Sequence, residues 1–183
     1  MLFNNFKKLP AIFFDRDGVI TIPVDLNGKG FAPRNLNDFK FYNDAKDSLL
    51  RTRAAGFFNV VVSNQPDVSS GLLSLNMLES MNTVLRHSLA LDEVINCPHN
   101  SSDHCLCRKP KPGMIYAAAE KFGIDLSHSW IVGDRDGDIA AGSSAGLKTI
   151  FIDRNWLEET GSMAKFKCKS LKEAVDLIIT GNF

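Results

Sequence analysis

Short apolar runs that end abruptly at polar residues alternate along the chain with segments of helical spacing. Ala11–Phe14 (AIFF), Phe57–Val62 (FFNVVV) and Trp130–Gly133 (WIVG) are mostly apolar, which is typical of strands buried on both faces. Glu93–Cys97 and Leu147–Ile152 are two further candidate strands. This alternation predicts a three-layer α/β fold, in which helices cover both faces of a central parallel sheet.

Capping residues bound the predicted helices. These run from a cap at Asn43 or Asp44 to about Ala55, from a cap at Ser74 to about Ala90, and over Met114–Phe122, Asp136–Ala145 and Leu171–Thr180. In such folds ligands bind at the carboxyl ends of the strands, so the polar clusters there are candidate sites. The stretch Thr21–Lys40 has weak periodicity and is too long for a simple connection. It is either a surface excursion without chemistry or a functional loop, from which Arg34 could reach a distal phosphate or sugar.

Composition narrows the possible partners. The 183 residues, 44% of them hydrophobic, suffice for one domain spanning 1–183 that needs no oligomer for its core, so we expect a monomer. Lys plus Arg and Asp plus Glu number 21 each, which argues against nucleic acid or membrane held by bulk charge. The first ten residues lack the apolar centre of a signal peptide, and a cytoplasmic location is expected.

Two acidic clusters follow candidate strands. Asp15 and Asp17 come directly after the first strand, and two carboxylates that close predict either a shared proton or a divalent cation, for which oxygen ligands favour Mg²⁺. A second set of carboxylates directly follows the candidate strand WIVG, in the sequence Gly133-Asp134-Arg135-Asp136-Gly137-Asp138. Asp134 could complete a metal site with Asp15, and Asp138 could support it from the next helix.

Phosphate-binding groups follow in the same positions. Ser63-Asn64-Gln65 ends the second strand with hydroxyl, amide and backbone N–H groups suited to phosphate oxygens. Arg108-Lys109-Pro110-Lys111-Pro112-Gly113 places fixed cations before a helix. A nucleophile, an acid, a metal and these donors are together the equipment of phosphoryl transfer through a covalent intermediate.

A third cluster predicts a structural metal. Cys97-x-His99 and Cys105-x-Cys107 form two ligand pairs within the loop 97–107, enough to close a tetrahedral site. Thiolate and imidazole prefer Zn²⁺, and four such ligands leave no open position. His104 is the alternative nitrogen ligand, with poorer chelation geometry because it adjoins Cys105.

The motifs DRDGV, SNQ, RKPKPG and GDRDGD, in this order over 11–153, resemble those of the haloacid dehalogenase superfamily of phosphatases. The resemblance implies Asp15 as nucleophile and Asp17 as general acid and base. It also implies Mg²⁺ held by Asp15, the backbone carbonyl of Asp17 and Asp134. It assigns Ser63 and Lys109 to stabilisation of the phosphoryl group. Contacts with the rest of the substrate are assigned to Arg16, Asn64, Gln65 and Arg108.

The string CPH…CxCRKPKPGM resembles the branch that contains heptose-bisphosphate and histidinol-phosphate phosphatases, small enzymes without a large cap domain. The resemblance implies a phosphorylated sugar as substrate, more closely on the heptose side, with histidinol phosphate as the alternative. A catalytically silent, zinc-stabilised binding module is the contrary class. A polynucleotide end-phosphatase is disfavoured because the chain lacks a net positive field.

Overall fold

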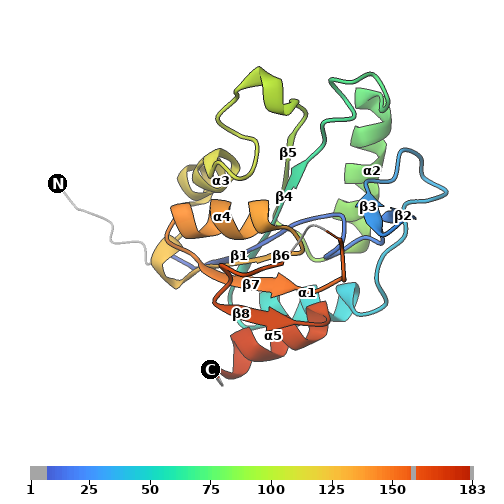
Figure 1. The fold of residues 1–183 in the computed structure, drawn as a ribbon. Helices are drawn as coiled ribbons and strands as arrows, with labels where there is room; N and C mark the ends of the chain where they lie inside the picture. Colours follow the sequence, from blue (N-terminus) through green and yellow to red (C-terminus); the bar gives the residue numbers. More distant parts are fainter. Residues whose placement is uncertain (1–7, 158–159, 182–183) are drawn as a thin grey trace.

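The computed structural model describes residues 8–157 and 160–181. Its centre is a six-stranded parallel sheet in the order β5-β4-β1-β6-β7-β8 (Figure 1). The strands are β1 (Ala11–Phe14), β4 (Phe58–Asn64), β5 (Glu93–Cys97), β6 (Trp130–Gly133), β7 (Lys148–Ile152) and β8 (Phe166–Cys168). The predicted α/β fold is thereby confirmed. Residues 1–7, which carry most of the segment judged for a signal peptide, lie outside the described residues.

Five of these strands match the predicted ones to within two residues. The second predicted strand continues further than expected, because Ser63 and Asn64 still pair with Asn96 and Cys97 of β5. The sixth strand, β8, was not predicted. It has only three residues and lies at the sheet edge beside β7, so it carries almost no periodicity of its own.

Five α-helices among the described residues cover the sheet. They are α1 (Ala45–Ala54), α2 (Leu75–Ser88), α3 (Gly113–Phe122), α4 (Asp136–Ser144) and α5 (Leu171–Thr180), with short 3₁₀ turns at Ser101–Asp103 and Leu126–His128. One apolar cluster joins α1, α2 and α5 to one face of the sheet, and a second joins α3 and α4 to the other (Figure 1). Each face of the predominantly apolar strands is therefore buried.

Local capping agrees with the predicted helix starts, with one exception. The hydroxyl of Ser74 accepts a hydrogen bond from the Met77 amide (3.1 Å), as expected of an N-cap residue. The side chain of Asp44 does not cap α1. It accepts instead from the Lys172 amide (3.0 Å), and so ties the start of α1 to α5. The second helix ends at Ser88, two residues before the predicted end.

The long excursion after β1 is an ordered hairpin. Strands β2 (Val24–Leu26) and β3 (Lys29–Phe31) pair antiparallel, and the turn residues Asn27 and Gly28 both have positive φ, at 56° and 77°. An Asn-Gly pair between short strands is a strong hairpin signal that the sequence analysis missed. The Ile22 amide donates to the Lys40 carbonyl (2.8 Å) and closes the base. The hairpin stands over the carboxyl ends of the sheet.

The sheet topology determines where a ligand can bind. The chain leaves β1 for β4 on one side and later returns to β6 on the other, so the strand order reverses beside β1. A crevice at such a switch point is the usual ligand site of an open α/β sheet. No helix of the described residues is long and apolar enough to cross a membrane.

Candidate active site

The polar clusters predicted at three strand ends meet in one cavity. Phe14 of β1 is in register with Val61 of β4 and Val132 of β6, so the three strands end side by side. The next residue, Asp15, donates its amide to the Val132 carbonyl (2.9 Å). A cavity of about 320 Å³ opens there, within the size range of small-molecule sites. Its lining includes Asp15, Asp17, Ser63, Asn64, Gln65, Arg108, Lys109 and Asp138.

Three buried carboxylates form an acidic cluster beside this cavity. One ligating oxygen each of Asp15, Asp134 and Asp138 lie within 4.8 Å of one another. Burial raises the pKa of Asp15 to about 6 against the opposing charge of Lys109. Burial, together with the charges of Asp15 and Asp138, raises the pKa of Asp134 well above its usual value. Asp15 and Asp134 are thus held where ionisation is costly without a cation.

The acidic cluster fits a divalent cation. Asp134 is fully buried, and its Oδ1 has no hydrogen-bond partner among the described residues. A buried carboxylate oxygen without a donor is costly unless it meets a proton or a metal. Oxygen ligands from carboxylates are those that Mg²⁺ uses. The donor set and the unpaired oxygen therefore both suit Mg²⁺.

Lys109 supplies the positive charge next to the acidic cluster. Its Nζ lies 2.6 Å from Asp15 Oδ1, 2.5 Å from Asp138 Oδ1 and 2.7 Å from the Val62 carbonyl. Burial by itself would lower the pKa of the ammonium, but Asp138 and Asp15 outweigh it and raise that pKa above the usual value. Lys109 is therefore a fixed cation at the point where a phosphoryl group would meet Asp15. Asp138 lies with Asp15 and Asp134, as the sequence predicts, and it also pairs with Lys109, which the sequence did not indicate.

Asp17 lies in the cavity wall and is held from three sides. Its carboxylate accepts from Arg16 Nε (3.0 Å to each oxygen), from Thr21 Oγ1 (2.8 Å) and from Gln65 Nε2 (2.8 Å). These donors fix the carboxylate that the sequence analysis expects to act as acid and base. Thr21 was not recognised, although its place four residues after Asp17 in a tight turn was a possible signal.

Arg16, which was predicted to contact the substrate, is not among the residues that line the cavity. Its side chain is fully buried, the guanidinium pairs with Asp17 (2.8 Å), and it lies 5.3 Å above the ring of Phe39. Residues that alternate in and out of a turn point to opposite sides, so Asp15 and Asp17 face the cavity while Arg16 faces the core. Arg16 instead positions Asp17.

The SNQ segment mostly holds other groups in place. Asn64 Nδ2 donates to the Lys109 carbonyl and Asn64 Oδ1 accepts from the Lys109 amide, both at 3.0 Å. Gln65 Nε2 bridges Asp17 and the Ser63 hydroxyl, at 2.8 Å to each. The expected substrate contacts of Asn64 and Gln65 thus compete with contacts already made inside the protein. Ser63 keeps its place in the lining as a candidate phosphate donor.

The four ligands of the loop 97–107 converge. The Sγ atoms of Cys97, Cys105 and Cys107 lie 3.2–3.6 Å apart, and His99 Nδ1 lies 3.5 Å from Cys97 Sγ and 3.3 Å from Cys107 Sγ. Ligands around tetrahedral zinc are separated by roughly 3–4 Å, given Zn–S bonds of about 2.3 Å. His99, and not His104, joins the three thiols. The cluster therefore fits Zn²⁺.

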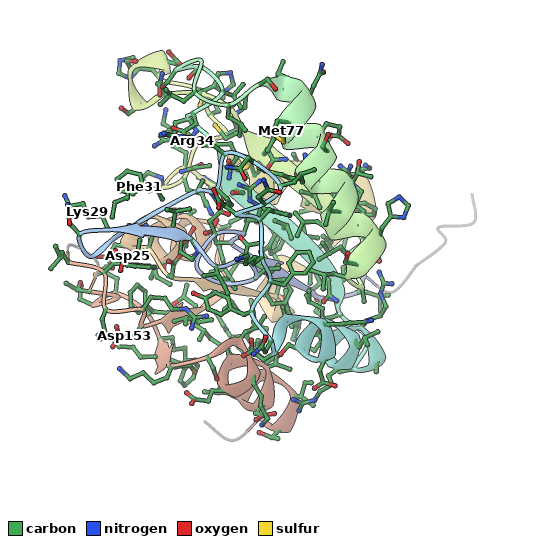
Figure 2. The ribbon with its side chains drawn as sticks, turned by 90° about the vertical axis from the view of Figure 1, so that its right-hand side faces the viewer. Asp25, Lys29, Phe31, Arg34, Met77 and Asp153 are labelled. Atoms are coloured by element: carbon green, nitrogen blue, oxygen red, sulfur yellow. The ribbon has the colours of Figure 1, made fainter. Side chains whose placement is uncertain are left out.

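The loop 97–107 also positions the rim of the cavity. Arg108, which follows it directly, lines the cavity and donates to the His99 carbonyl (3.1 Å). On the opposite rim the β2–β3 hairpin contributes Gly30 and Phe31. Arg34 is partly exposed and pairs with the rim residue Asp67 (2.7 Å); Figure 2 shows it between the hairpin and α2. The cavity lining thus includes Arg108, Arg135 and the ring of Phe31, and Arg34 is joined to it through Asp67.

Trp156 was missed by the sequence analysis. Its Nε1 donates to Asp134 Oδ2 (2.6 Å) from the segment that follows β7. Gly18 approaches Asp134 from the other side, so closely that an added Cβ would lie 1.9 Å from Asp134 Oδ2. A tryptophan in an irregular segment carries no pattern that points to an acidic cluster.

Comparisons with known proteins agree with this geometry. Residues 106–174 match the HAD-hydrolase-like family. The chain is 33% identical over 175 residues to the D-glycero-beta-D-manno-heptose-1,7-bisphosphate 7-phosphatase of Helicobacter pylori strain J99, covering 92% of this chain and 96% of that protein. It is 31% identical over 158 residues to the alpha-heptose enzyme of Photorhabdus laumondii, covering 80% and 83%.

A solved structure shows the same fold. The D,D-heptose 1,7-bisphosphate phosphatase from B. bronchiseptica, crystallised with magnesium and phosphate, superposes with a TM-score of 0.80 at 24% identity. The match covers 94% of this chain and 99% of that one. The extent and identity of the sequence matches show that this chain belongs to the heptose-1,7-bisphosphate 7-phosphatase family of HAD-like hydrolases and is a phosphoric monoester hydrolase.

Proposed function

We propose that this chain is a Mg²⁺-dependent phosphatase that removes the 7-phosphate of D-glycero-D-manno-heptose 1,7-bisphosphate. The observation that carries the proposal is the convergence of Asp15, Asp134 and Asp138 beside a cavity of about 320 Å³, with the Lys109 ammonium paired to Asp15 and Asp138. The relatives named above act on this class of sugar, and they include both anomers. Which anomer this chain prefers is part of the test below.

In the proposed reaction a carboxylate oxygen of Asp15 attacks the phosphorus, and the bond from phosphorus to the sugar oxygen breaks. Asp17 gives its proton to the departing alkoxide, which leaves as the sugar alcohol. Asp17 then takes a proton from water as the water attacks the aspartyl-phosphate. That second step releases inorganic phosphate and restores both carboxyl groups. Thr21, Arg16 and Gln65 hold the Asp17 carboxylate for these transfers.

Charge on the phosphoryl oxygens is met by groups already in place. The Lys109 ammonium and the Ser63 hydroxyl face the cavity, and donors fixed before the reaction cost no reorganisation when charge develops. Mg²⁺, held by Asp15, Asp134 and the backbone carbonyl of Asp17, would supply further positive charge at this point. Asp138 holds Lys109 in line with Asp15.

We further propose that zinc fills the cluster of Cys97, His99, Cys105 and Cys107 and has a structural role. Hydrogen bonds from the Arg108 backbone and the neighbouring thiols outweigh the effect of burial and lower the pKa of the Cys105 thiol to about 7. Burial raises the pKa of the Cys97 and Cys107 thiols, so zinc would have to displace their protons on binding. The loop leads directly into Arg108 and Lys109, so the metal would fix both cations.

Asp15→Asn tests the reaction. The amide keeps the size of the side chain and removes the nucleophile, so phosphate release should fall by roughly 10³-fold or more while circular dichroism stays unchanged. Asp176→Asn, on α5, is the matched control, because Asp176 makes only surface ion pairs with Arg51 and Lys172. If the Asp15→Asn protein turns over substrate at the wild-type rate, the assignment of Asp15 as the nucleophile is wrong.

A substrate panel tests the specificity. Purified protein is assayed on both anomers of heptose 1,7-bisphosphate and on histidinol phosphate, with Mg²⁺ and with EDTA. We expect kcat/KM to be highest on a heptose bisphosphate and activity to vanish with EDTA. Faster turnover of histidinol phosphate would show that the chain is a histidinol-phosphate phosphatase. Absence of turnover on every phosphomonoester would favour a silent binding module, and tight, salt-sensitive DNA binding would favour a polynucleotide end-phosphatase.

A further inference from the structure

A segment outside the predicted motifs contacts both the acidic cluster and the cavity rim. Residues 153–157 follow β7 and belong to no helix or strand. In Figure 2 Asp153, the first of them, lies on the same side of the molecule as Asp25 and Lys29 of the β2–β3 hairpin. The Leu157 amide donates to the Gly28 carbonyl at the hairpin turn (3.3 Å). The segment therefore joins the end of β7 to the hairpin.

Within this segment Trp156 contacts Asp134 directly. Its Nε1–H donates to Asp134 Oδ2 at 2.6 Å, while Oδ1 of the same carboxylate has no partner among the described residues. A donor on one oxygen fixes the rotation of the carboxylate and leaves the other oxygen for a cation. Donors that orient ligating groups in this way commonly change metal affinity by about 10–100-fold.

The indole ring is itself locked in place by the hairpin and by Arg135. An added Cβ on Gly30 would lie 2.7 Å from Trp156 Cζ2, so the ring packs directly on the hairpin backbone. The Arg135 guanidinium lies 5.6 Å from the ring centre, and its Nη2 donates to the Gly30 carbonyl (2.5 Å). Gly30 also lines the cavity. One ring thus joins Asp134 to the rim that the substrate must pass.

We propose that Trp156 is a positioning residue for the bound cation, which fixes Asp134 through its indole N–H and couples the β2–β3 hairpin to the metal site. The inference rests on the proposed function only in taking Asp134 as a Mg²⁺ ligand. Trp156 is not among the residues that line the cavity, so its loss should weaken Mg²⁺ binding and leave the chemistry at saturating Mg²⁺ largely intact.

Trp156→Phe isolates the N–H, because phenylalanine keeps an aromatic ring against Gly30 and Arg135. Mg²⁺ alone is titrated by calorimetry into the purified chain, which is freed of Mg²⁺ but keeps the zinc it holds. We expect the Kd for Mg²⁺ to rise about tenfold or more, with KM at saturating Mg²⁺ within about twofold of wild type. Trp130→Phe is the matched control, since Trp130 is the other of the two tryptophans and lies buried in β6. Its Kd should stay within about twofold.

Fluorescence provides a second readout that does not require Trp156 to be removed. In the Trp130→Phe protein Trp156 is the only fluorophore of its kind. Its emission should change on adding Mg²⁺, with the same midpoint as calorimetry, because the indole shares a hydrogen bond with the ligating carboxylate.

Each outcome decides a different claim. A wild-type Kd in Trp156→Phe, with or without a lower melting temperature, would overturn the positioning role. If Trp156→Phe does not fold, a flat fluorescence titration of Trp130→Phe would overturn it and a saturable change would support it. If the wild-type protein binds no Mg²⁺, the assignment of Asp134 as a Mg²⁺ ligand in the proposed function would be wrong. Normal Mg²⁺ binding without phosphatase activity would contradict the proposed reaction but not the proposed role of Trp156.

Discussion

Lys109 Nζ donates to Asp15 Oδ1 at 2.6 Å, across 94 residues of sequence, and both side chains are buried. The same ammonium lies 2.5 Å from Asp138 Oδ1. One cation therefore balances two carboxylates in a place that water barely reaches. The contact ties the RKPKPG motif to both acidic motifs and makes the fold and the site depend on each other.

Lys109→Met should therefore reduce both stability and turnover. The carboxylates of Asp15 and Asp138 would stay buried without their cation, and breaking such a pair costs about 3 kcal/mol of unfolding free energy. Urea denaturation of the protein without Mg²⁺, but with its zinc retained, measures the loss. Added Mg²⁺ should restore part of it, because a divalent cation next to Asp15 replaces some of the missing charge. Lys111→Met is the control, since Lys111 donates only to carbonyls at the surface, and it should stay within about 0.5 kcal/mol. Equal stability of the two variants would contradict the prediction.

Gly18→Ala should weaken Mg²⁺ binding. Gly18 has a φ of +103°, and a Cβ there would collide with the Asp134 carboxylate, 1.9 Å from Oδ2. Displacing this buried side chain should weaken Mg²⁺ binding at least tenfold, as measured by calorimetry.

Gly56→Ala separates this collision from backbone strain. Gly56 also has a positive φ, of +90°, yet an added Cβ would meet nothing within 4 Å. It should lose about 1 kcal/mol of stability with Mg²⁺ affinity and turnover unchanged. Similar Mg²⁺ affinities in the two variants would show that close approach at Gly18 is unimportant.

Arg16→Lys tests whether Arg16 holds Asp17 in place. Lysine cannot reproduce the two Nε contacts that hold Asp17, so kcat should fall about tenfold while KM stays within about twofold. Arg108→Lys is the comparison, because Arg108 lines the cavity and its replacement should raise KM. A rise in KM for Arg16→Lys would restore the original interpretation that it contacts the substrate.

Removal of zinc should destabilise the protein. We expect about one zinc per chain by elemental analysis, and a strong chelator should lower the melting temperature, because a structural zinc contributes directly to folding. Cys107→Ser should lose the metal and most activity, since the loop holds Arg108 through the His99 carbonyl. The Cys168→Ser protein should keep both the metal and the activity, because Cys168 lies in β8, outside the cluster of Cys97, His99, Cys105 and Cys107. Metal-free wild-type protein with unchanged stability would contradict a structural zinc.

Local features of the fold were readable without coordinates because they depend on neighbours in sequence. The run Ala11–Phe14 is recognised by four consecutive apolar residues, and Ser74 caps α2 by accepting from an amide three residues later. The β2–β3 hairpin was equally local, since Asn27 and Gly28 mark its turn, but that signal was overlooked. The short strand β8 contains too few residues for any period to show.

The amino-acid sequence by itself determined the order of strands and helices, the acidic and basic motifs at their ends, and the clustering of three Cys and one His in the loop 97–107, since these follow from spacing along the chain. Only the tertiary structure decided that Arg16 turns inward to hold Asp17, that Asp138 pairs with Lys109, and that Trp156 reaches Asp134. The physical reason is that these contacts join segments brought together by the crossovers and packing of the sheet. A side chain's partner is then set by which elements become neighbours, and spacing along the chain does not record that.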